Sequence, residues 1–175
     1  MRTSRVRGPL CRCVYVRGER VVLRAATRRD VAAIAKMERA ASLTEHRLLP
    51  DIAGRRLDAR VSRRHWRRSI ANPRRRLFVA ARGVDVVGAI GVDLLVSRHR
   101  FAHVRRRVYL HSLFIAPPAR RLGLARRLTR LALDWGRGRG AVQARLEMAA
   151  PNRSARRLYE SVGFRVREMM FARPL

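Results

Sequence analysis

The chain has 175 residues, a length that fits one domain with a buried core. Its 42 lysine and arginine residues against 12 aspartate and glutamate residues give a formal net charge of +30, while a hydrophobic share of 47% argues against a wholly disordered chain. No apolar run approaches the ~20 residues that cross a bilayer, and arginines interrupt the N-terminal segment, so we expect a soluble, cytoplasmic protein without a membrane partner.

The positive charge is carried almost entirely by arginine, since Lys36 is the only lysine. A field of this size attracts polyanions, so an electrostatic association with nucleic acid or the ribosome is one interpretation. The other is a compositional bias toward arginine, which the spread of arginines along the whole chain favours. Cys11 and Cys13 alone are too few ligands for a structural zinc site, and no other spacing predicts a metal.

The first part of the chain predicts a strand and a helix. Residues 1–19 are basic and aperiodic, which is typical of a poorly ordered extension. A short apolar strand is predicted over residues 20–25. Thr27 and Asp30 then have the spacing of a capping box, which predicts a helix that runs to about Ala41.

Residues 44–59 are mixed in character, with Pro50 and Gly54 as breakers, and predict a loop that has room for a short helix. The apolar stripe that includes Trp66 predicts a second helix over residues 61–71, which Asn72 and Pro73 end.

The middle of the chain predicts an antiparallel pair and a buried strand. Residues 77–81 and 86–96 are apolar runs around a turn at residues 83–85. A basic loop at residues 97–107 leads into residues 108–115, the most apolar run, which we predict to be the central strand.

The last part predicts two helices between strands. Over residues 121–137, leucines and a tryptophan recur at helical spacing. Alternation predicts a strand over residues 142–148, and Asn152 opens a helix that Gly163 closes in a left-handed conformation. Residues 164–171 complete the predicted elements as a final strand.

This order predicts an α/β fold of the α+β kind, in which a central mixed sheet is flanked by about four helices. We expect a single domain over residues 20–175, with no internal repeat.

The hexapeptide from Arg120 to Ala125 has the chemistry of a phosphate site. A helix start presents unpaired amides and the positive end of the helix dipole. Gly123 lets an anion approach the main chain closely, and Arg120 can add a forked contact to phosphate oxygens. The alternative is an ordinary connection between a strand and a helix, with one turn glycine.

A second element follows at Asn152 and Tyr159, which are seven residues apart and therefore share one helical face. Separately, Asn152 could be only an N-cap and Tyr159 only a core aromatic. Their occurrence together with Ala155 and Gly163 at this distance after the hexapeptide favours a shared site.

From about Arg20 onward the chain resembles the GNAT superfamily of N-acetyltransferases. The run Arg120-x-x-Gly123-x-Ala125 is similar to the acyl-CoA loop of that family, and residues 152–164 are similar to its asparagine and tyrosine helix. Arg121 departs from the pattern, because many members have glycine there.

The resemblance implies a GNAT fold and acetyl-CoA as the acyl donor. It implies that the pantetheine lies along the strand end at Phe114 and Ile115, that main-chain amides near Leu122 to Arg127 meet the pyrophosphate, and that Asn152 orients the donor. Tyr159 would protonate the departing thiolate, and a main-chain amide near a strand bulge would polarise the carbonyl. The implied donor-binding residues are Phe114, Ile115, Arg120, Arg121, Leu122, Gly123, Leu124, Ala125, Arg126, Asn152 and Tyr159.

The attacking amine also needs a base, which the motifs do not fix. His111 is the preferred candidate because some family members carry an acidic residue at that strand position, although it could be only a hydrogen-bonded strand histidine. Glu147 is the second candidate, and Glu38 and Asp93 are weaker ones.

The sequence therefore predicts an N-acetyltransferase that transfers an acetyl group to a primary amine by direct attack. The acceptor is a small molecule, a protein N-terminus or a lysine. The basic surface disfavours polycationic acceptors such as polyamines, and the protein is expected to be a monomer or homodimer. The alternative is a polyanion-binding module on the same fold with little or no transferase activity.

Overall fold

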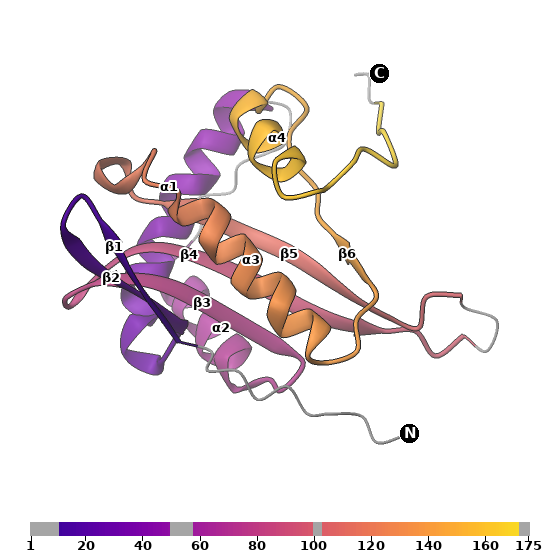
Figure 1. The fold of residues 1–175 in the computed structure, drawn as a ribbon, viewed down its shortest axis with the longest axis horizontal. Coiled ribbons are helices and arrows are strands. Elements are labelled where there is room, and N and C mark those ends of the chain that lie inside the picture. The colour runs from indigo at the N-terminus through magenta and orange to yellow at the C-terminus, as the bar shows by residue number, and fades with distance from the viewer. Residues whose placement is uncertain (1–10, 50–57, 100–102, 172–175) are drawn as a thin grey trace.

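The computed structural model describes residues 11–49, 58–99 and 103–171, which form one six-stranded sheet with four α-helices (Figure 1). The strands lie in chain order, each antiparallel to the one before it except β6, which is parallel to β5. The strands are β1 (Arg12–Val16), β2 (Glu19–Ala25), β3 (Arg75–Arg82), β4 (Asp85–Val96), β5 (Arg106–Ile115) and β6 (Gln143–Arg145). The helices are α1 (Val31–Leu48), α2 (Ala59–Ala71), α3 (Leu124–Arg137) and α4 (Arg153–Glu160), with 3-10 turns at Arg28–Asp30 and Pro117–Ala119. The predicted mixed sheet flanked by four helices is confirmed.

The sheet separates two layers of helices. Helix α3 covers one face, where Leu128, Leu131 and Trp135 pack against buried side chains of the sheet (Figure 1). Helices α1 and α2 lie on the other face, where Ile34 and Trp66 form a second cluster. Burial of these apolar faces supplies most of the stabilisation of such a layered fold.

The predicted capping box at the start of α1 is present and is joined to the sheet. The main-chain N–H and the hydroxyl of Thr27 both donate to Asp30 Oδ2, at 2.6 and 2.9 Å. Arg24 of β2 donates to both carboxylate oxygens of Asp30, at 2.7 and 2.9 Å. Burial by itself would raise the pKa of Asp30, but these hydrogen bonds outweigh it and the pKa is lowered.

The N-terminal boundary differs from the prediction. Within residues 1–19, expected to be a disordered extension, β1 pairs with β2 through a turn in which Arg17 and Gly18 have φ of +51° and +79°. Two consecutive positive φ values are the geometry of a tight hairpin turn. Val14 and Val16 pack on the core. The alternation of apolar side chains in this short edge strand was not recognised in the sequence, because arginines surround it.

Two further predictions were wrong: the end of the first helix and the central place of residues 108–115 in the sheet. Helix α1 continues to Leu48 instead of ending near Ala41, so part of the predicted loop at residues 44–59 is helical; residues 50–57 lie outside the described part. Strand β5 is the fifth of six strands and is not central. The strands that are buried along most of their length are β3 and β4, whereas β5 is buried only in part.

The C-terminal part of the structure also differs from the prediction. Strand β6 is only Gln143–Arg145, shorter than the predicted 142–148. The predicted strand at 164–171 does not form in its described residues, where Met170 and Phe171 are exposed. Alternating side chains are not sufficient for a strand, because its main chain also needs a paired neighbour.

Asp30→Asn should lower the free energy of unfolding by about 1–3 kcal/mol near neutral pH, because two charge-assisted bonds to Arg24 are lost. Since the folded-state pKa of Asp30 is depressed, the wild-type advantage is present above the unfolded-state pKa of about 3.9 and is lost as the pH falls through the folded-state value. Urea unfolding of both proteins across this range measures the difference. The exposed Asp85→Asn variant is the control, and a gap that persists at the acid end would contradict the prediction.

Candidate functional site

The start of α3 is built on a left-handed turn. Gly123 caps the helix with φ +72°, and Arg121 has φ +62°. A β-carbon on Gly123 would meet no atom within 4 Å, so the main-chain conformation, and not crowding, favours glycine there. Arg121 takes the same conformation at a cost of about 1–2 kcal/mol, which explains why glycine is common at this position in the family that the sequence resembles.

The amino end of α3 is arranged electrostatically for an anion. Gly123 offers no side-chain cap, and the first turn of α3 holds no acidic residue. The first helical hydrogen bond runs from Arg127 N to Gly123 O at 3.1 Å, which leaves the amides of Leu124, Ala125 and Arg126 without a carbonyl partner in the helix. Exposed arginines at the positive end of a helix dipole are unfavourable unless an anion neutralises them.

Arg120 joins this turn to the end of β5. Its Nε donates to the carbonyl oxygen of Ile115 at 3.1 Å, and its guanidinium carbon lies 5.9 Å from the centre of the Phe114 ring. The predicted residues Phe114, Ile115 and Arg120 are therefore brought together with the turn at Gly123. The guanidinium of Arg120 remains exposed in this position.

The end of β5 has a neighbour on one side only. Its parallel pairing with β6 covers three residue pairs and ends at Tyr109, opposite Arg145. Beyond that point β5 continues to Ile115 with β4 as its partner, while the chain after β6 turns toward α4 (Figure 1). The outer edge of β5 from Leu110 to Ile115 is thus left without a paired strand among the described residues.

The hydrogen bonds at the end of α4 hold the main chain at Tyr159 in place. The N–H of Phe164 donates to Tyr159 O, and the N–H of Gly163 donates to Glu160 O, both at 3.0 Å. With φ +96° at Gly163, these bonds form a Schellman motif, which confirms the predicted left-handed helix end. The motif sets the Phe164 ring edge-on to Tyr159, with ring centres 5.8 Å apart.

The surroundings of Tyr159 keep its hydroxyl protonated. Burial, followed by the nearby Glu45 carboxylate and the Tyr109 phenol, raises the pKa of Tyr159 to about 12. Glu45 lies in the last turn of α1, which the sequence analysis had assigned to a loop.

Asn152 is the N-cap of α4. Its side-chain oxygen accepts from the N–H of Ala155 at 3.0 Å. This capping bond fixes the side chain, and only the amide nitrogen is left to donate to a ligand.

A bulge in β5 reshapes the face below α1 and α2. Two residues of β5, Ser112 and Leu113, lie opposite Ile90 alone, between the pairs Gly91 with His111 and Ala89 with Phe114. Ser112 has φ +52°, a strained conformation for a residue other than glycine. The predicted strand bulge is therefore present.

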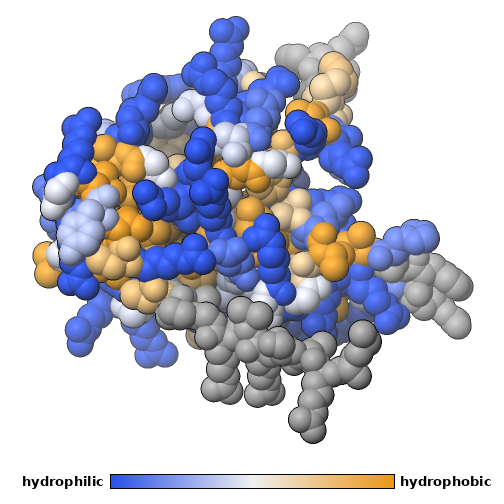
Figure 2. Space-filling view, in the orientation of Figure 1, coloured by the Kyte–Doolittle hydropathy of each residue, from blue (hydrophilic) through white to orange (hydrophobic). Residues whose placement is uncertain are grey.

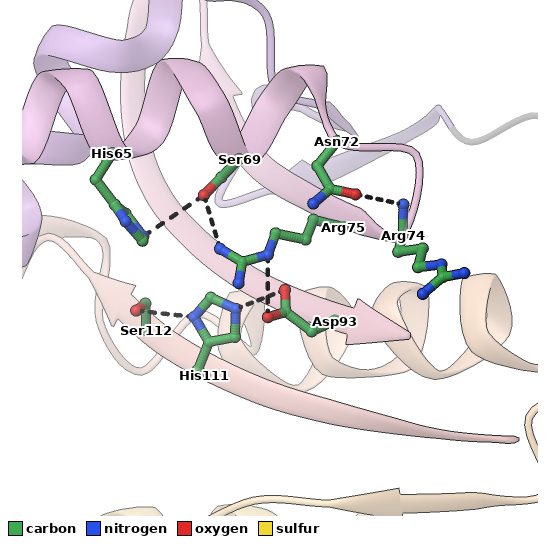
Figure 3. A network of polar contacts seen from close by, with 8 residues as sticks. All are labelled: His65, Ser69, Asn72, Arg74, Arg75, Asp93, His111 and Ser112. Atoms are coloured by element: carbon green, nitrogen blue, oxygen red, sulfur yellow. Dashed lines mark hydrogen bonds and ion pairs between the residues drawn. The ribbon is translucent and has the colours of Figure 1, made fainter. Parts of the chain in front are cut away.

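The bulge places His111 in a polar network (Figure 3). His111 Nε2 lies 3.2 Å from Asp93 Oδ1, and His111 Nδ1 lies 3.1 Å from the Ser112 hydroxyl. Asp93 also pairs with Arg75 at 3.3 Å, which in turn donates to Ser69. The carboxylate holds the imidazole in one orientation, an arrangement suited to proton transfer.

Two further contacts fix the His111 ring. The Trp66 ring lies parallel to it, with centres 6.2 Å apart. Gly91 lies directly against its edge, because a β-carbon there would be 2.2 Å from His111 Cε1. Position 91 of β4 must therefore be glycine for the His111 imidazole to lie here.

The second base candidate lies elsewhere. Glu147 is exposed beyond the end of β6, where burial and this carboxylate together raise the pKa of the Tyr109 phenol. Glu38, one of the weaker candidates, accepts from the Ser62 hydroxyl and from Trp66 Nε1 at α2.

A cavity of about 200 Å³ lies between α1, α2 and the bulge of β5. Glu38 and Glu45 of α1 line it together with Trp66, Ser112 and Phe114. The cavity thus reaches the bulge on one side and, through Glu45, the surroundings of Tyr159 on another. Sequence reasoning missed Glu45 and Ser112. The seven-residue spacing of Glu38 and Glu45 would have indicated a shared face only once α1 was known to continue.

Two searches of the described residues give negative findings. Within residues 11–49, 58–99 and 103–171, no three histidine, cysteine or carboxylate side chains are grouped so as to hold a metal ion. No helix in the same ranges combines the length and the apolar character needed to cross a bilayer.

Comparison with known proteins gives a family match over most of this region. A family model described as "Acetyltransferase (GNAT) family" matches residues 41–164. A search of curated proteins finds no match.

Solved structures share the fold at low identity. A tetramutant of the BH1408 protein from Bacillus halodurans has a TM-score of 0.79 at 18% identity, covering 87% of this chain and 99% of that one. A predicted acetyltransferase from Clostridium acetobutylicum, solved with acetyl-CoA, has a TM-score of 0.69 at 14% identity, covering 88% and 96%. The aminoglycoside N-acetyltransferase AAC(6')-Iy, in complex with CoA, has a TM-score of 0.70 at 15% identity, covering 92% and 99%. The predicted fold is confirmed by these likenesses.

Proposed function

Because the chain belongs to the acetyltransferase (GNAT) family, we propose that it transfers an acetyl group from acetyl-CoA to the nitrogen of a primary amine by direct attack. The observation that carries this proposal is the uncapped, arginine-rich start of α3 beside the open edge of β5 and the half-buried phenol of Tyr159. The acetyl-CoA and CoA named for two similar structures support the choice of donor.

The residues of the chain fit a donor of this kind. The main-chain N–H groups of Leu124 to Arg126 would donate to the pyrophosphate oxygens, and Arg120 and Arg121 would add positive charge. The unpaired edge of β5 at Phe114 and Ile115 would bond the amide groups of the pantetheine as another strand would. Asn152 would donate from its amide nitrogen.

When bound, acetyl-CoA supplies a thioester whose carbonyl carbon is open to attack. The amine nitrogen forms a bond to that carbon as the bond from carbon to sulfur breaks, and a main-chain amide at the bulge near Ser112 stabilises the charge on the oxygen. Tyr159 gives its proton to the sulfur. The raised pKa of about 12 keeps this proton on the phenol until the thiolate develops, and solvent then restores it.

His111 would accept the proton that the amine loses. The Ser112 hydroxyl lines the cavity and lies 3.1 Å from His111 Nδ1, so a water or this hydroxyl could link amine and imidazole. Asp93 would act as a positioning residue, because it fixes the ring and stabilises the imidazolium. Glu147 is exposed and lies by Tyr109, which makes it the second candidate.

A polyanion-binding module remains the rival function. On the face shown in Figure 2, hydrophilic side chains are spread over the surface and are not gathered over one element. Release of free CoA thiol from acetyl-CoA across a panel of amines decides between the two. Salt-sensitive RNA binding without any thiol release would favour the rival.

Tyr159→Phe should lower kcat by about 10²–10⁴-fold, because the thiolate would leave without a proton donor. The KM for acetyl-CoA should change by no more than about twofold, since the phenol contributes to the transition state and little to binding. Steady-state kinetics of thiol release test this, with the exposed Tyr15→Phe as control. An unchanged kcat would remove Tyr159 from the proposed mechanism.

His111→Ala should lower kcat/KM by about 10²-fold and remove a limb of its pH profile, because the amine would lose its proton acceptor. Asp93→Asn should lower the rate less and shift the same limb, as expected for a positioning residue. The exposed His103→Ala variant is the control. A wild-type pH profile in His111→Ala would transfer the role of base to Glu147.

A further inference from the structure

The cavity beside the bulge differs in charge from the rest of the molecule. Lysine and arginine make up 42 of 175 residues, so ten residues drawn at random would include about two of them. The ten described residues that line the cavity include no lysine, arginine or histidine, and they include the carboxylates Glu38 and Glu45. The walls of the cavity are therefore acidic within a chain of net charge +30.

Glu38 is held in place without a cation. Its Oε2 accepts from the Ser62 hydroxyl and, at 2.9 Å, from Trp66 Nε1, and both donors belong to buried residues of α2. Among the described residues, no basic side chain lies within ion-pair distance of Glu38, although Asp30, Asp93 and Asp134 each pair with arginine. Because both donors are neutral, they orient the Glu38 carboxylate without compensating its negative charge. This charge is therefore available to a ligand.

Glu45 extends the acidic wall toward the reaction centre. It lies seven residues after Glu38 on α1, which places the two on one face of the helix about 10 Å apart along its axis. Glu45 is close enough to Tyr159 to raise the pKa of that phenol. A ligand that spans the cavity would therefore meet one carboxylate near Tyr159 and the other beside Trp66.

We propose that the acceptor is an amine with a second positive charge, and that Glu38 binds this second cation while the reacting nitrogen lies at the bulge near Ser112. This proposal rests on the proposed function and defines its acceptor. The basic surface disfavoured a polycationic acceptor, but the local charge of the cavity outweighs it. Solvent screens the interaction of a bound ligand with the cavity walls less than its interaction with distant arginines.

Three acceptors that differ only at the distal end test the charge preference. They are 1,5-diaminopentane, 5-aminopentan-1-ol and 5-aminopentanoate, all offered with acetyl-CoA at moderate ionic strength. The wild type should prefer the diamine by about tenfold in kcat/KM over the alcohol and should use the acid least. An equal rate for diamine and alcohol, or a preference for the acid, would overturn the proposal.

Glu38→Gln keeps the shape of the side chain and an oxygen that can accept from Ser62 and Trp66. It should lower kcat/KM for the diamine far more than for the alcohol, so that the preference for the diamine is lost. Glu19→Gln makes the same change in an exposed carboxylate of β2 and should leave all three rates unchanged. Equal losses with all three acceptors in Glu38→Gln would mean a structural role and would overturn the proposal.

A binding measurement distinguishes failure of the cation site from failure of the proposed transferase function. Thermal stabilisation of the protein by 1,5-diaminopentane needs no turnover, and it should be greater than that by the alcohol and be lost in Glu38→Gln. If no acceptor releases thiol, the proposed function fails and the thermal shifts alone decide the cation site. If thiol is released without any charge preference and the diamine does not stabilise the protein, the cation site fails while the transferase stands.

Discussion

The site depends on the left-handed turn that carries the chain from the end of β5 into α3. Positive φ values at Arg121 and Gly123 let α3 begin without a side-chain cap, so that the amides of its first turn face outward next to Ile115. The same first turn carries arginines and no acid, which is unfavourable for an isolated helix and favourable for one that binds a phosphate. The turn therefore has a conformational cost and an unfavourable concentration of positive charge, and a bound anion would compensate the charge.

Strand β5 contributes to both the proposed donor site and the proposed acceptor site. Its outer edge separates from β6 after Tyr109, and its bulge at Ser112 turns consecutive side chains toward α1 and α2. In the proposed function, the donor would lie along the outer edge of β5 and the acceptor would lie beside its bulge. Gly91 and Trp66 confine the His111 ring against the bulge, so the base candidate is held by packing as well as by Asp93.

The sequence predicted those parts of the site whose geometry is local. Gly123, the capping box at Thr27 and the helix end at Gly163 each follow from a short-range main-chain requirement, and each is present. Features that depend on distant partners were not predictable. The hydrogen bond between His111 and Asp93 joins two strands, and Glu45 gains a role only because α1 continues past Ala41. The strand expected at residues 164–171 fails for the same reason, since its pattern carries no information on a pairing partner.

Two glycines allow the central claim to be tested with a matched pair. Gly18 and Gly123 have similar positive φ values and open space where a β-carbon would lie, so alanine at either should cost about 1 kcal/mol of stability. Isothermal titration with CoA should show wild-type affinity in Gly18→Ala and at least about tenfold weaker binding in Gly123→Ala. Equal CoA affinities in the two variants would contradict the assignment of the turn before α3 as the phosphate site.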